Sequence, residues 1–598
     1  MRKLLTGTSL AASLAAVVGM VALPASASRA HDPLVSVGSP LTPFSENKQN
    51  EPALAVDQHH PRILVAGAND EIDEEACNAG DDTTCPFTPG IGVSGVYFSF
   101  NAGKSWTQPT YTGLTARNCQ GQVGNTDPPC TPAFGPIGTL PWYYEKGLIS
   151  DGDPALAFGP APGPHGFSWA NGDRLYYANL TSNISSKPSE QGFKGVEGVG
   201  VSRTDDVAAA AAGDKDAWMR PVVIPASFSA AAFADKEQVW ADNVSSSRHF
   251  GNVYLCFENY KGGPSVGSNT NALIVARSTD GGGSWAKQIL VKNTSSSSGI
   301  SGLLSGQSGC TIRTDSTGNV YVFWQGFDKK TKTQGIYMAK SADGGKTYST
   351  PRRLFTTKHT GVFDPVLGRF TMDGIAGARD DLSNAPSADI ANGAPNGAGA
   401  TNQIVLSWVD GKFGLNHEPV LLSTSTTGGR TWTAPRKIDG TGKPSNRGYY
   451  AAPAISPNGS DVYVTYNAWL EPYKHSTIGA ANDRPLAGIV THADVAANGT
   501  IGAFTRLIES TPGDARGSSQ NGLTAEFLGD YVYSIATRTY GAGVWNDVRN
   551  AADCPAVDAW RMSLRTGSSV PSPAPQQDCK PAFGNSDIFG ASFTDPTP

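Results

Sequence analysis

Charged side chains are scarce in this sequence. They make up 16% of its 598 residues, and the formal net charge at pH 7 is −6. A chain without a basic surplus lacks the positive face that nucleic-acid binding needs, so we expect no nucleic-acid partner. After the first 30 residues, no apolar stretch is long enough to cross a bilayer. We therefore expect no membrane span in the mature chain.

Several short catalytic and cofactor motifs are also missing. The sequence contains no HExxH, no GxSxG and no phosphate-binding glycine loop. Its eight cysteines lack the C-x-x-C-like spacing of a metal cluster, and its nine histidines are scattered. These absences argue against the enzyme classes that depend on such motifs. We expect neither a metal centre nor a cofactor.

The first 30 residues read as a secretory signal peptide. Arg2 and Lys3 give a positive start, residues 10–23 form an apolar run, and 25–27 read Ala-Ser-Ala, a small-residue cleavage site, with 28–30 as a second option. A membrane anchor would need a longer apolar run. We therefore expect an exported, secreted protein.

The cysteines fit an oxidising compartment. They fall into pairs that are close in sequence: Cys77 with Cys85, Cys119 with Cys130, Cys256 with Cys310, and Cys554 with Cys579. Proximity predicts these four disulfides.

Glycine and proline are plentiful, with 69 and 41 residues, and aromatics reach 9%. This composition is typical of a turn-rich, all-β protein. One pattern, S-x-(D/N/T)-x-G-x-(S/T)-aromatic, occurs four times, at 99–106, 278–285, 341–348 and 425–432. We call it the Ser–Gly motif. Its polar side chains can bond the turn backbone, its glycine tolerates positive φ, and its aromatic ring can be buried under the turn or against a neighbouring sheet. We therefore interpret it as structural.

The motif belongs to a longer repeat. In 309–355, two alternating strands precede a third strand that runs into the motif, and a short fourth strand follows it. Repeats of four antiparallel strands are the signature of a β-propeller. We count seven such units and favour seven blades over six. The last unit lacks an outer strand, and we expect residues 34–41 to supply it and close the ring.

This interpretation makes residues 31–598 a single propeller that follows the signal peptide at 1–30. We expect inserts at about 110–150, 181–225 and 551–584. We expect a monomer.

The S-x-D-x-G-x-x-W pattern resembles the Asp-box, or bacterial neuraminidase repeat, of sialidases and related propellers. The resemblance implies a six- or seven-bladed propeller with a pocket on its axis and with the motifs on the outer rim of the opposite face. Sialidases grip an acidic sugar with three arginines and use a Tyr nucleophile paired with Glu and an Asp acid. Their early Arg-Ile-Pro strand has no counterpart here, because residues 60–64 read HPRIL.

Loops that precede the first strand and follow the second strand of each blade share one face. Side chains near these points are rich in carboxylates and amides. Paired carboxylates suit acid/base glycoside cleavage, and Glu237 and Asp153 are our candidates. The resemblance adds Tyr450, or its neighbour Tyr449, as the nucleophile. It also implies that Arg549 binds the carboxylate of the substrate, with Arg369 and Arg379 as its partners. The predicted catalytic residues are Glu237, Asp153, Tyr450 and Arg549, and the predicted substrate-binding residues are Asp235, Asp547, Trp545 and Arg379.

Two functions remain open at this point. One is a sialidase-like glycoside hydrolase that acts on an extracellular glycan or glycoprotein. The other is a non-catalytic propeller that binds a glycan or a protein. The segment at 70–82 packs seven acidic residues into thirteen, so Ca²⁺ binding is an alternative to a solvated loop.

Overall fold

The structure is a computed structural model. It describes residues 1, 31–37, 48–77, 87–120, 130–185, 197–224, 232–261, 270–295, 306–328, 330–520 and 522–597. The predicted signal peptide lies almost entirely outside these residues. Within them, no helix has the length and apolarity needed to span a bilayer.

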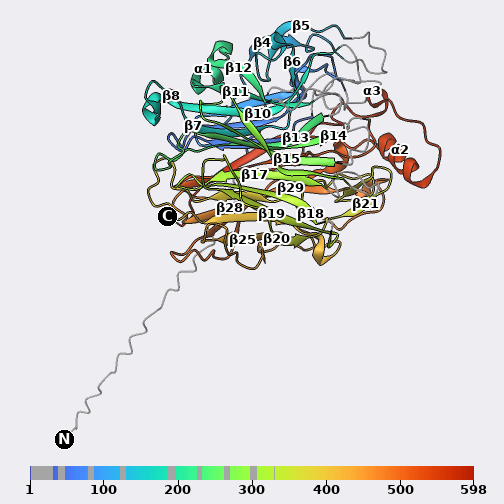
Figure 1. The fold of residues 1–598 in the computed structure, drawn as a ribbon. Helices are drawn as coiled ribbons and strands as arrows, with labels where there is room; N and C mark the ends of the chain where they lie inside the picture. The colour runs from blue at the N-terminus through green and yellow to red at the C-terminus, as the bar shows by residue number, and fades with distance from the viewer. Residues whose placement is uncertain are drawn as a thin grey trace.

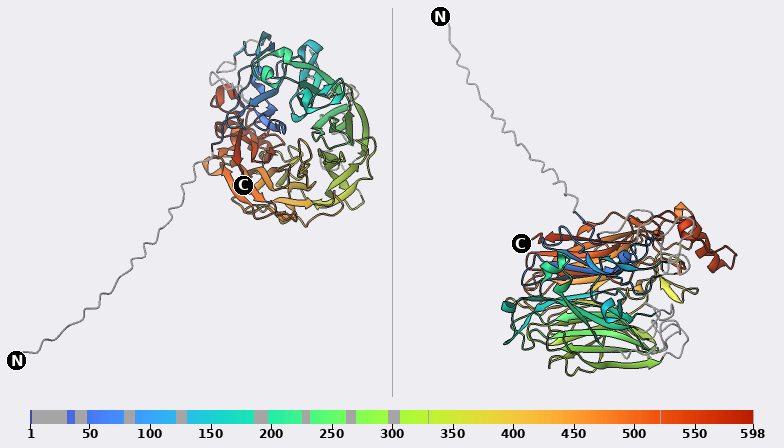
Figure 2. Two further views of the ribbon diagram at one scale, coloured as in Figure 1. Left: turned by 90° about the vertical axis from the view of Figure 1, so that its left-hand side faces the viewer. Right: turned by 90° about the horizontal axis from the view of Figure 1, so that it is seen from above.

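Seven antiparallel sheets stand around one axis and form a β-propeller (Figure 2, left). The innermost strands contact one another in chain order, and the first of them, β1, contacts the last, β32. The ring is therefore closed, which confirms the prediction of seven blades. Figure 1 views the ring from the side, so the blades are seen edge-on and overlap one another in the picture.

The blades follow one another in sequence, each running from the axis outward. Blade 1 consists of β1 (Asn50–Val56), β2 (Leu64–Asn69) and β3 (Ser94–Ser99). Blade 2 consists of β7 (Ala155–Pro160), β10 (Asp173–Asn183), β11 (Gly198–Thr204) and β12 (Trp218–Ile224). Blade 3 consists of β13 (Ala232–Ala241), β14 (Val253–Lys261), β15 (Thr270–Ser278) and β16 (Ala286–Ser295).

Blades 4 to 7 repeat this order. Blade 4 consists of β17 (Gln307–Thr314), β18 (Val320–Asp328), β19 (Thr333–Ser341) and β20 (Arg352–Thr357), and blade 5 of β23 (Ser387–Ile390), β24 (Ile404–Val409), β25 (Val420–Ser425) and β26 (Arg436–Lys437). Blade 6 consists of β27 (Arg447–Ile455), β28 (Asp461–Trp469), β29 (Pro485–Asp494) and β30 (Thr505–Glu509). Blade 7 consists of β32 (Tyr533–Ala536), β33 (Tyr540–Asp547) and β34 (Asp587–Thr594).

The N-terminal segment supplies the missing outer strand of blade 7. Leu34 pairs antiparallel with Phe589 of β34. The Val35 N–H donates to the Ile588 carbonyl at 2.8 Å. The predicted closure of the ring is thus confirmed for the part of 34–41 that the structure describes. Pairing the first strand with the last links the two ends of the chain, so the ring cannot open without breaking this sheet.

The inner strands β1 and β7 are buried along their length because both of their faces are covered by adjacent blades. All seven residues of β1 and all six of β7 are buried.

Two tryptophans near the ends of second strands, Trp408 in blade 5 and Trp545 in blade 7, are fully buried. Each indole N–H donates to an aspartate two residues further on, Asp410 or Asp547. This W-x-D pair therefore has a structural role in both blades.

The Ser–Gly motif bonds to its own turn, as the sequence predicted. In 278–285, the Ser278 hydroxyl donates to Asp280 at 2.7 Å and accepts the Gly282 N–H at 2.8 Å. The Trp285 indole N–H donates to the Gly282 carbonyl, so the ring lies under the turn. The corresponding glycine N–H donates to the corresponding serine hydroxyl in each of the other three copies.

The motif also contacts the preceding blade. A Cβ added to Gly282 would lie 2.9 Å from Arg203 Cδ of blade 2, and one added to Gly345 would lie 3.0 Å from Tyr254 of blade 3. The motif therefore holds each blade against its predecessor. It follows third strands and so lies at the end of the propeller where the inner strands finish. We call this end the motif face and the opposite end the cavity face.

A loop at 390–402 crosses the axis on the motif face. The Gly393 N–H donates to Pro457 between β27 and β28. The Pro395 carbonyl accepts from Trp169 between β7 and β10 and from Ser245 between β13 and β14. The Arg538 guanidinium in blade 7 donates to the Ala398 carbonyl at 2.7 Å. The loop, which belongs to blade 5, thus contacts blades on several sides of the ring.

Longer connections lie mainly on the cavity face, at the right in Figure 1. They carry β4 (Tyr111–Thr115), β5 (Ala133–Ile137), β6 (Leu148–Ser150), β21 (Val362–Asp364), β22 (Arg369–Thr371), β31 (Gly513–Asp514), α2 (Pro555–Thr566) and α3 (Pro575–Asp578). The motif face carries the short pair β8 (Pro162–Gly163) and β9 (Gly166–Phe167), and helix α1 (Val207–Ala211) precedes β12. The insert predicted at about 181–225 contains two blade strands, β11 and β12.

Three predicted disulfides are present: Cys119–Cys130, Cys256–Cys310 and Cys554–Cys579. The prediction for Cys77 and Cys85 lies outside the described residues, because Cys85 is not among them. The Cys256–Cys310 bond joins blade 3 to blade 4, and Cys554–Cys579 links the start of α2 to the end of α3.

Two adjacent glycines of one motif provide a test of its turn. Gly282 has φ +81°, whereas Gly283 is not in the left-handed region and its added Cβ would meet only Asp280, at 3.3 Å. We expect Gly282→Ala to lower the free energy of unfolding by about 1–2 kcal/mol. Gly283→Ala should leave it nearly unchanged. Urea unfolding followed by tryptophan fluorescence measures both, and equal losses would contradict the proposed turn geometry.

Candidate functional site

The inner strands of several blades begin with the same unusual backbone conformation. Glu51, Asp153, Lys236 and Tyr450 have φ between +50° and +59°, and Gly309 has φ +57°. Bulges accompany these positions in blades 1, 3, 4 and 6. A left-handed residue other than glycine costs of order 1–3 kcal/mol and persists only where the surroundings enforce it. Here the charged members converge at the axis on the cavity face.

Lys236 is the centre of this convergence. Its Nζ lies 2.7 Å from Asp530, 3.3 Å from Asp153, 3.5 Å from Asp235 and 3.8 Å from Glu51. These carboxyls come from blades 1, 2 and 3 and from the connection that precedes β32. The lysine side chain is only 5% exposed. One buried ammonium group thus faces four carboxyl groups.

Arg379, from the connection before blade 5, is the second cation. Its guanidinium lies 2.8 Å from Asp530 and 3.6 Å from Glu51. The Tyr450 hydroxyl donates to the other oxygen of Asp530 at 2.8 Å. Asp530 is therefore bound on three sides, by Lys236, Arg379 and Tyr450.

A cavity of about 320 Å³ opens above this cluster. Its lining includes three of the carboxyls, Glu51, Asp153 and Asp235, together with Lys236 and Arg379. Arg369, a third of whose side chain is exposed, also lines it and pairs with Asp381 at 2.7 Å. The aromatic rings of Phe233 and Phe527 contribute apolar wall. Acidic groups, cations and aromatic rings therefore share one concave site of ligand size.

The carboxyls differ in their affinity for protons. Burial, followed by the Asp153 charge, raises the pKa of Glu51 well above its usual range. Burial also raises the pKa of Asp235 well above its usual range, although Lys236 opposes this shift. Burial alone would raise the pKa of Asp153 as well, but the Lys236 charge and the hydrogen bonds with Glu51 and Asp235 together outweigh it and lower that pKa. Arg379 and Lys236 likewise lower the pKa of Asp530 against the effect of burial.

These opposite shifts balance the charge of the cluster. The two cations, Lys236 and Arg379, favour the ionised forms of Asp153 and Asp530, whereas Glu51 and Asp235 hold their protons more tightly than ordinary carboxyl groups. Both acids are within hydrogen-bond reach of Asp153. Asp235 is the most exposed of the four carboxyls, at 17% of its side chain. The cavity therefore places a carboxyl group with a raised pKa, Asp235, beside one with a lowered pKa, Asp153, and such a separation of pKa values suits a general acid paired with an ionised carboxylate.

Four of the eight predicted site residues meet here. Asp153, Asp235 and Arg379 line the cavity, and Tyr450 lies beneath it, with its hydroxyl on Asp530. Glu237 is adjacent in sequence but does not line the cavity. Its side chain is buried, and neither carboxyl oxygen accepts a hydrogen bond from another described residue. Burial, with the Asp153 charge, raises the pKa of Glu237 well above its usual range, so this group is a neutral acid inside blade 3.

The other three predicted residues form a separate group. Arg549 lies 2.7 Å from Asp547 and 2.7 Å from Asp32 of the N-terminal segment, and its guanidinium stacks over Phe589. Trp545 is fully buried and packs against Gly488 of blade 6. These contacts tie the closing blade to the N-terminal segment, and none of the three residues lines the cavity.

Two central residues, Lys236 and Asp530, were not predicted. Lys236 occupies the second position of the DKEQ sequence, which corresponds to Glu51 in NEPA and Asp153 in GDPA at the starts of their inner strands. Aligning these strand starts would have indicated it. Asp530 had no such signal in the sequence. The nearby Glu526 pairs instead with Arg484, at 2.6 Å.

The acidic segment at 70–82 is described only as far as residue 77. Within that part, Asp70 accepts hydrogen bonds from Gln49, Tyr97 and Gln108. Asp73 pairs with Arg117 at 2.7 Å and also accepts bonds from the backbone of 138–139. These acids therefore fix the connections around blade 1, and Ca²⁺ binding by this segment stays a prediction.

No protein-family model and no curated protein matches the chain at a significant level. Solved structures with a similar fold include a Hadza microbial sialidase, with 12% identity, a TM-score of 0.38 and coverage of 70% of this chain and 63% of that one. An intramolecular trans-sialidase from Ruminococcus gnavus has 10% identity, a TM-score of 0.37 and coverage of 71% and 91%. An α-L-arabinofuranosidase from Fusarium graminearum has 10% identity, a TM-score of 0.38 and coverage of 82% and 98%.

The central lysine provides a test of the ion cluster. Lys236→Gln leaves the buried carboxyls with one cation fewer, and we expect it to lower the free energy of unfolding by about 3–5 kcal/mol. Lys412 is the matched control: it lies 3.3 Å from Asp410 but its side chain is 39% exposed. Lys412→Gln should cost less than about 1 kcal/mol. Similar losses in urea unfolding would show that Lys236 does not hold the cluster together.

The buried carboxyls also predict how stability depends on pH. Burial raises the pKa of Asp151, Glu258 and Asp380 to about 7, against about 4 in the unfolded chain. The folded state therefore binds these protons more tightly, and this stabilisation is lost as the pH rises from about 4 through 7. We expect the thermal midpoint to fall between pH 5 and pH 8.

Scanning calorimetry across that range measures the effect. Asp151→Asn should flatten part of the slope, whereas Asp216→Asn, at an exposed position, should not. A midpoint that rises between pH 5 and pH 8 would contradict the prediction.

Proposed function

We propose that the protein is an exported glycoside hydrolase that acts on extracellular glycans in the axial cavity. The observation that carries this proposal is the pair of neighbouring carboxyls in the cavity wall, in which the pKa of Asp235 is raised and that of Asp153 is lowered. Glycoside cleavage uses one carboxyl group as an acid toward the leaving oxygen and a second, ionised one on the sugar. Export is supported by the predicted signal peptide and by the disulfides.

Each carboxyl has a distinct role in this proposal. Asp235, the more exposed group, donates its proton to the glycosidic oxygen as the bond to the anomeric carbon breaks. Asp153 attacks the anomeric carbon as that bond breaks and forms a glycosyl ester, which a water molecule then hydrolyses with Asp235 as the base. The two carboxyls are within hydrogen-bond reach of each other, so their separation is nearer to the about 5–5.5 Å of retaining enzymes than to the about 6.5–9.5 Å at which inverting enzymes place a water molecule. We therefore expect retention of the anomeric configuration.

The cations of the cavity indicate the kind of sugar. Arg369 and Arg379 both line the wall and both approach Asp381, at 2.7 and 3.6 Å. Guanidinium groups bind carboxylates in a planar, two-point geometry. A substrate carboxylate can displace or join Asp381 there, so we propose that the sugar is acidic, as in a sialoside. Tyr450 positions Asp530 from below the floor of the cavity.

A glycan-binding propeller without catalysis is the second candidate. It is favoured by the extent to which Lys236 and Arg379 already neutralise Asp153 and Asp530, since satisfied carboxylates are typical of a binding surface. The two candidates differ in whether any glycosidic bond is cleaved.

The experiment is an assay of the secreted protein against fluorogenic glycosides that include a sialoside, a uronide and a neutral arabinoside. We expect cleavage of an acidic glycoside, with the product anomer retained in NMR spectra recorded early in the reaction. Asp235→Asn should lower kcat by about a hundredfold or more, because the acid is lost. Cleavage of none of the substrates, together with binding on a glycan array, would establish the binding function instead.

A matched pair of arginines controls for general damage to the fold. Arg379 and Arg549 each pair with aspartate at 2.7–2.8 Å, but only Arg379 lines the cavity. Arg379→Lys should raise KM for the acidic glycoside, while Arg549→Lys should not. If Arg549→Lys raises KM and Arg379→Lys does not, Arg549 binds the substrate carboxylate, as the family resemblance first suggested.

A further inference from the structure

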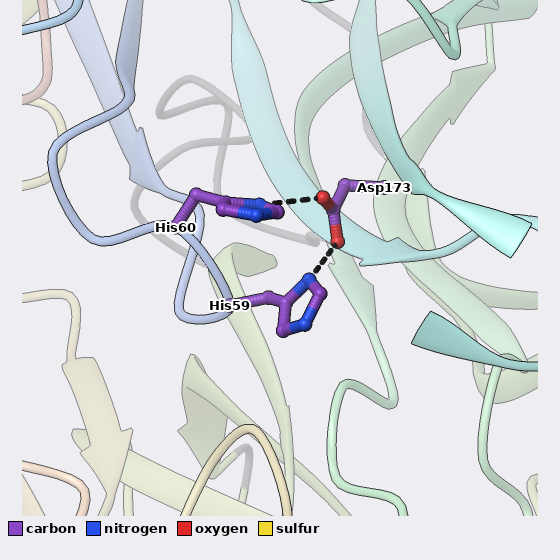
Figure 3. Close-up of side chains that lie close together, drawn as sticks. All are labelled: His59, His60 and Asp173. Atoms are coloured by element: carbon purple, nitrogen blue, oxygen red, sulfur yellow. Dashed lines mark hydrogen bonds and ion pairs between the residues drawn. The ribbon is translucent and has the colours of Figure 1, made fainter. Parts of the chain in front are cut away.

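Two adjacent histidines and an aspartate from the neighbouring blade meet on the motif face (Figure 3). His59 and His60 lie in the turn between β1 and β2 of blade 1, and Asp173 is the first residue of β10 in blade 2. His59 Nδ1 lies 2.9 Å from one Asp173 oxygen, and His60 Nδ1 lies 2.8 Å from the other. The three donor atoms lie within 4.8 Å of one another.

This donor set suits a divalent transition metal ion. Two imidazole nitrogens and a carboxylate are ligands that Zn²⁺, Co²⁺ and Ni²⁺ accept. With bonds of about 2.0–2.2 Å, ligand atoms on a tetrahedral ion lie about 3.3 Å apart, so the two short nitrogen–oxygen distances need to widen by only about half an ångström. To bind the ion, each Nδ1 must be free of its proton, which either moves to Nε2 or is released to solvent.

The residues around the triad hold it in place. Both backbone N–H groups of the pair donate to Asp57, at 2.8 and 3.1 Å, which fixes the turn. The His59 ring stacks on Trp169 with a centroid distance of 5.2 Å, and the Trp169 indole is anchored to Pro395 at 3.0 Å. A triad held by neighbouring groups in this way loses little freedom when a metal ion binds.

We propose that His59, His60 and Asp173 bind a zinc ion or a similar divalent transition metal that fastens blade 1 to blade 2. The side chains of His59 and His60 are 34% and 55% exposed, so the ion can enter from solvent and the remaining coordination positions are open to water. The site lies at the opposite end of the propeller from the axial cavity. The proposal is therefore independent of the proposed glycosidase activity.

A different explanation is that the two imidazoles only donate hydrogen bonds to Asp173. A second group of possible ligands, Asp461, His492 and Asp595, is also present among the described residues. There His492 Nε2 lies 3.0 Å from Asp461. Any test must therefore separate metal binding from the hydrogen-bonded pair, and the first triad from the second.

The test is equilibrium dialysis of the purified full chain against Zn²⁺, with Co²⁺ absorption spectra as a second measurement. We expect the wild type to bind zinc with micromolar or tighter affinity and to show Co²⁺ bands in the visible region. His59→Ala, His60→Ala and Asp173→Asn should each raise Kd about tenfold or more. His165→Ala, which removes a histidine between β8 and β9 on the same face, and His492→Ala should leave Kd unchanged.

The other possible results of these experiments also decide whether the triad of His59, His60 and Asp173 binds zinc. Zinc binding that is lost only in His492→Ala would assign the ion to the second group and overturn the proposal. Absence of zinc binding by the wild type at 100-fold excess would leave the hydrogen-bonded pair as the explanation. Metal-free melting curves check that each variant folds. If a histidine variant does not fold, Asp173→Asn and the wild-type Co²⁺ spectrum still give the answer.

Discussion

The buried ammonium group of Lys236 is the interaction on which the rest of the site depends. It lies within 3.8 Å of carboxyls that come from blades 1, 2 and 3 and from the connection into blade 7. Four such carboxyls brought together without a cation would repel one another in a medium of low dielectric constant. The ring can close around its axis because this lysine, with Arg379, neutralises them. The same neutralisation sets which carboxyl keeps its proton.

The backbone makes this arrangement possible at a local cost. Glu51, Asp153, Lys236 and Tyr450 adopt positive φ at the starts of their inner strands, which the isolated segments would not favour. Such conformations persist where surrounding structure enforces them, and they occur often at functional sites. The local strain and the ion cluster therefore support each other: the bulges bring the charged residues to the axis, and the charges hold the bulges in place.

Much of the fold was predictable from the sequence because it is encoded locally. The Ser–Gly motif forms hydrogen bonds within eight residues, so its turn could be inferred from 278–285 alone, and the closing role of Leu34 followed from the count of strands. The site was only partly predictable. Asp153 and Asp235 were placed correctly on the cavity face by strand register, but that register could not show that Glu237, two residues after Asp235, lies inside the blade.

Arg549 illustrates a second reason why the site residues could be predicted only in part. Its position after a second strand suggested the rim of the cavity, yet its partners are Asp547 and Asp32. Asp32 is more than five hundred residues away in sequence, so no local pattern could indicate this pair. Lys236 differs from Arg549 in this respect: aligning DKEQ with the starts of β1 and β7 indicates its position, but its burial follows only from the convergence of distant blades.

The loop at 390–402 has a consequence for any polymer that reaches the propeller. Because its residues bond to blades 2, 3, 6 and 7 across the axis on the motif face, a chain that enters from the cavity face meets a blind end. If glycans are cleaved in this cavity, as proposed, a polysaccharide cannot thread through the molecule or slide along it between cleavage events. Only a chain terminus or a short branch can reach the floor, and it must withdraw by the route through which it came.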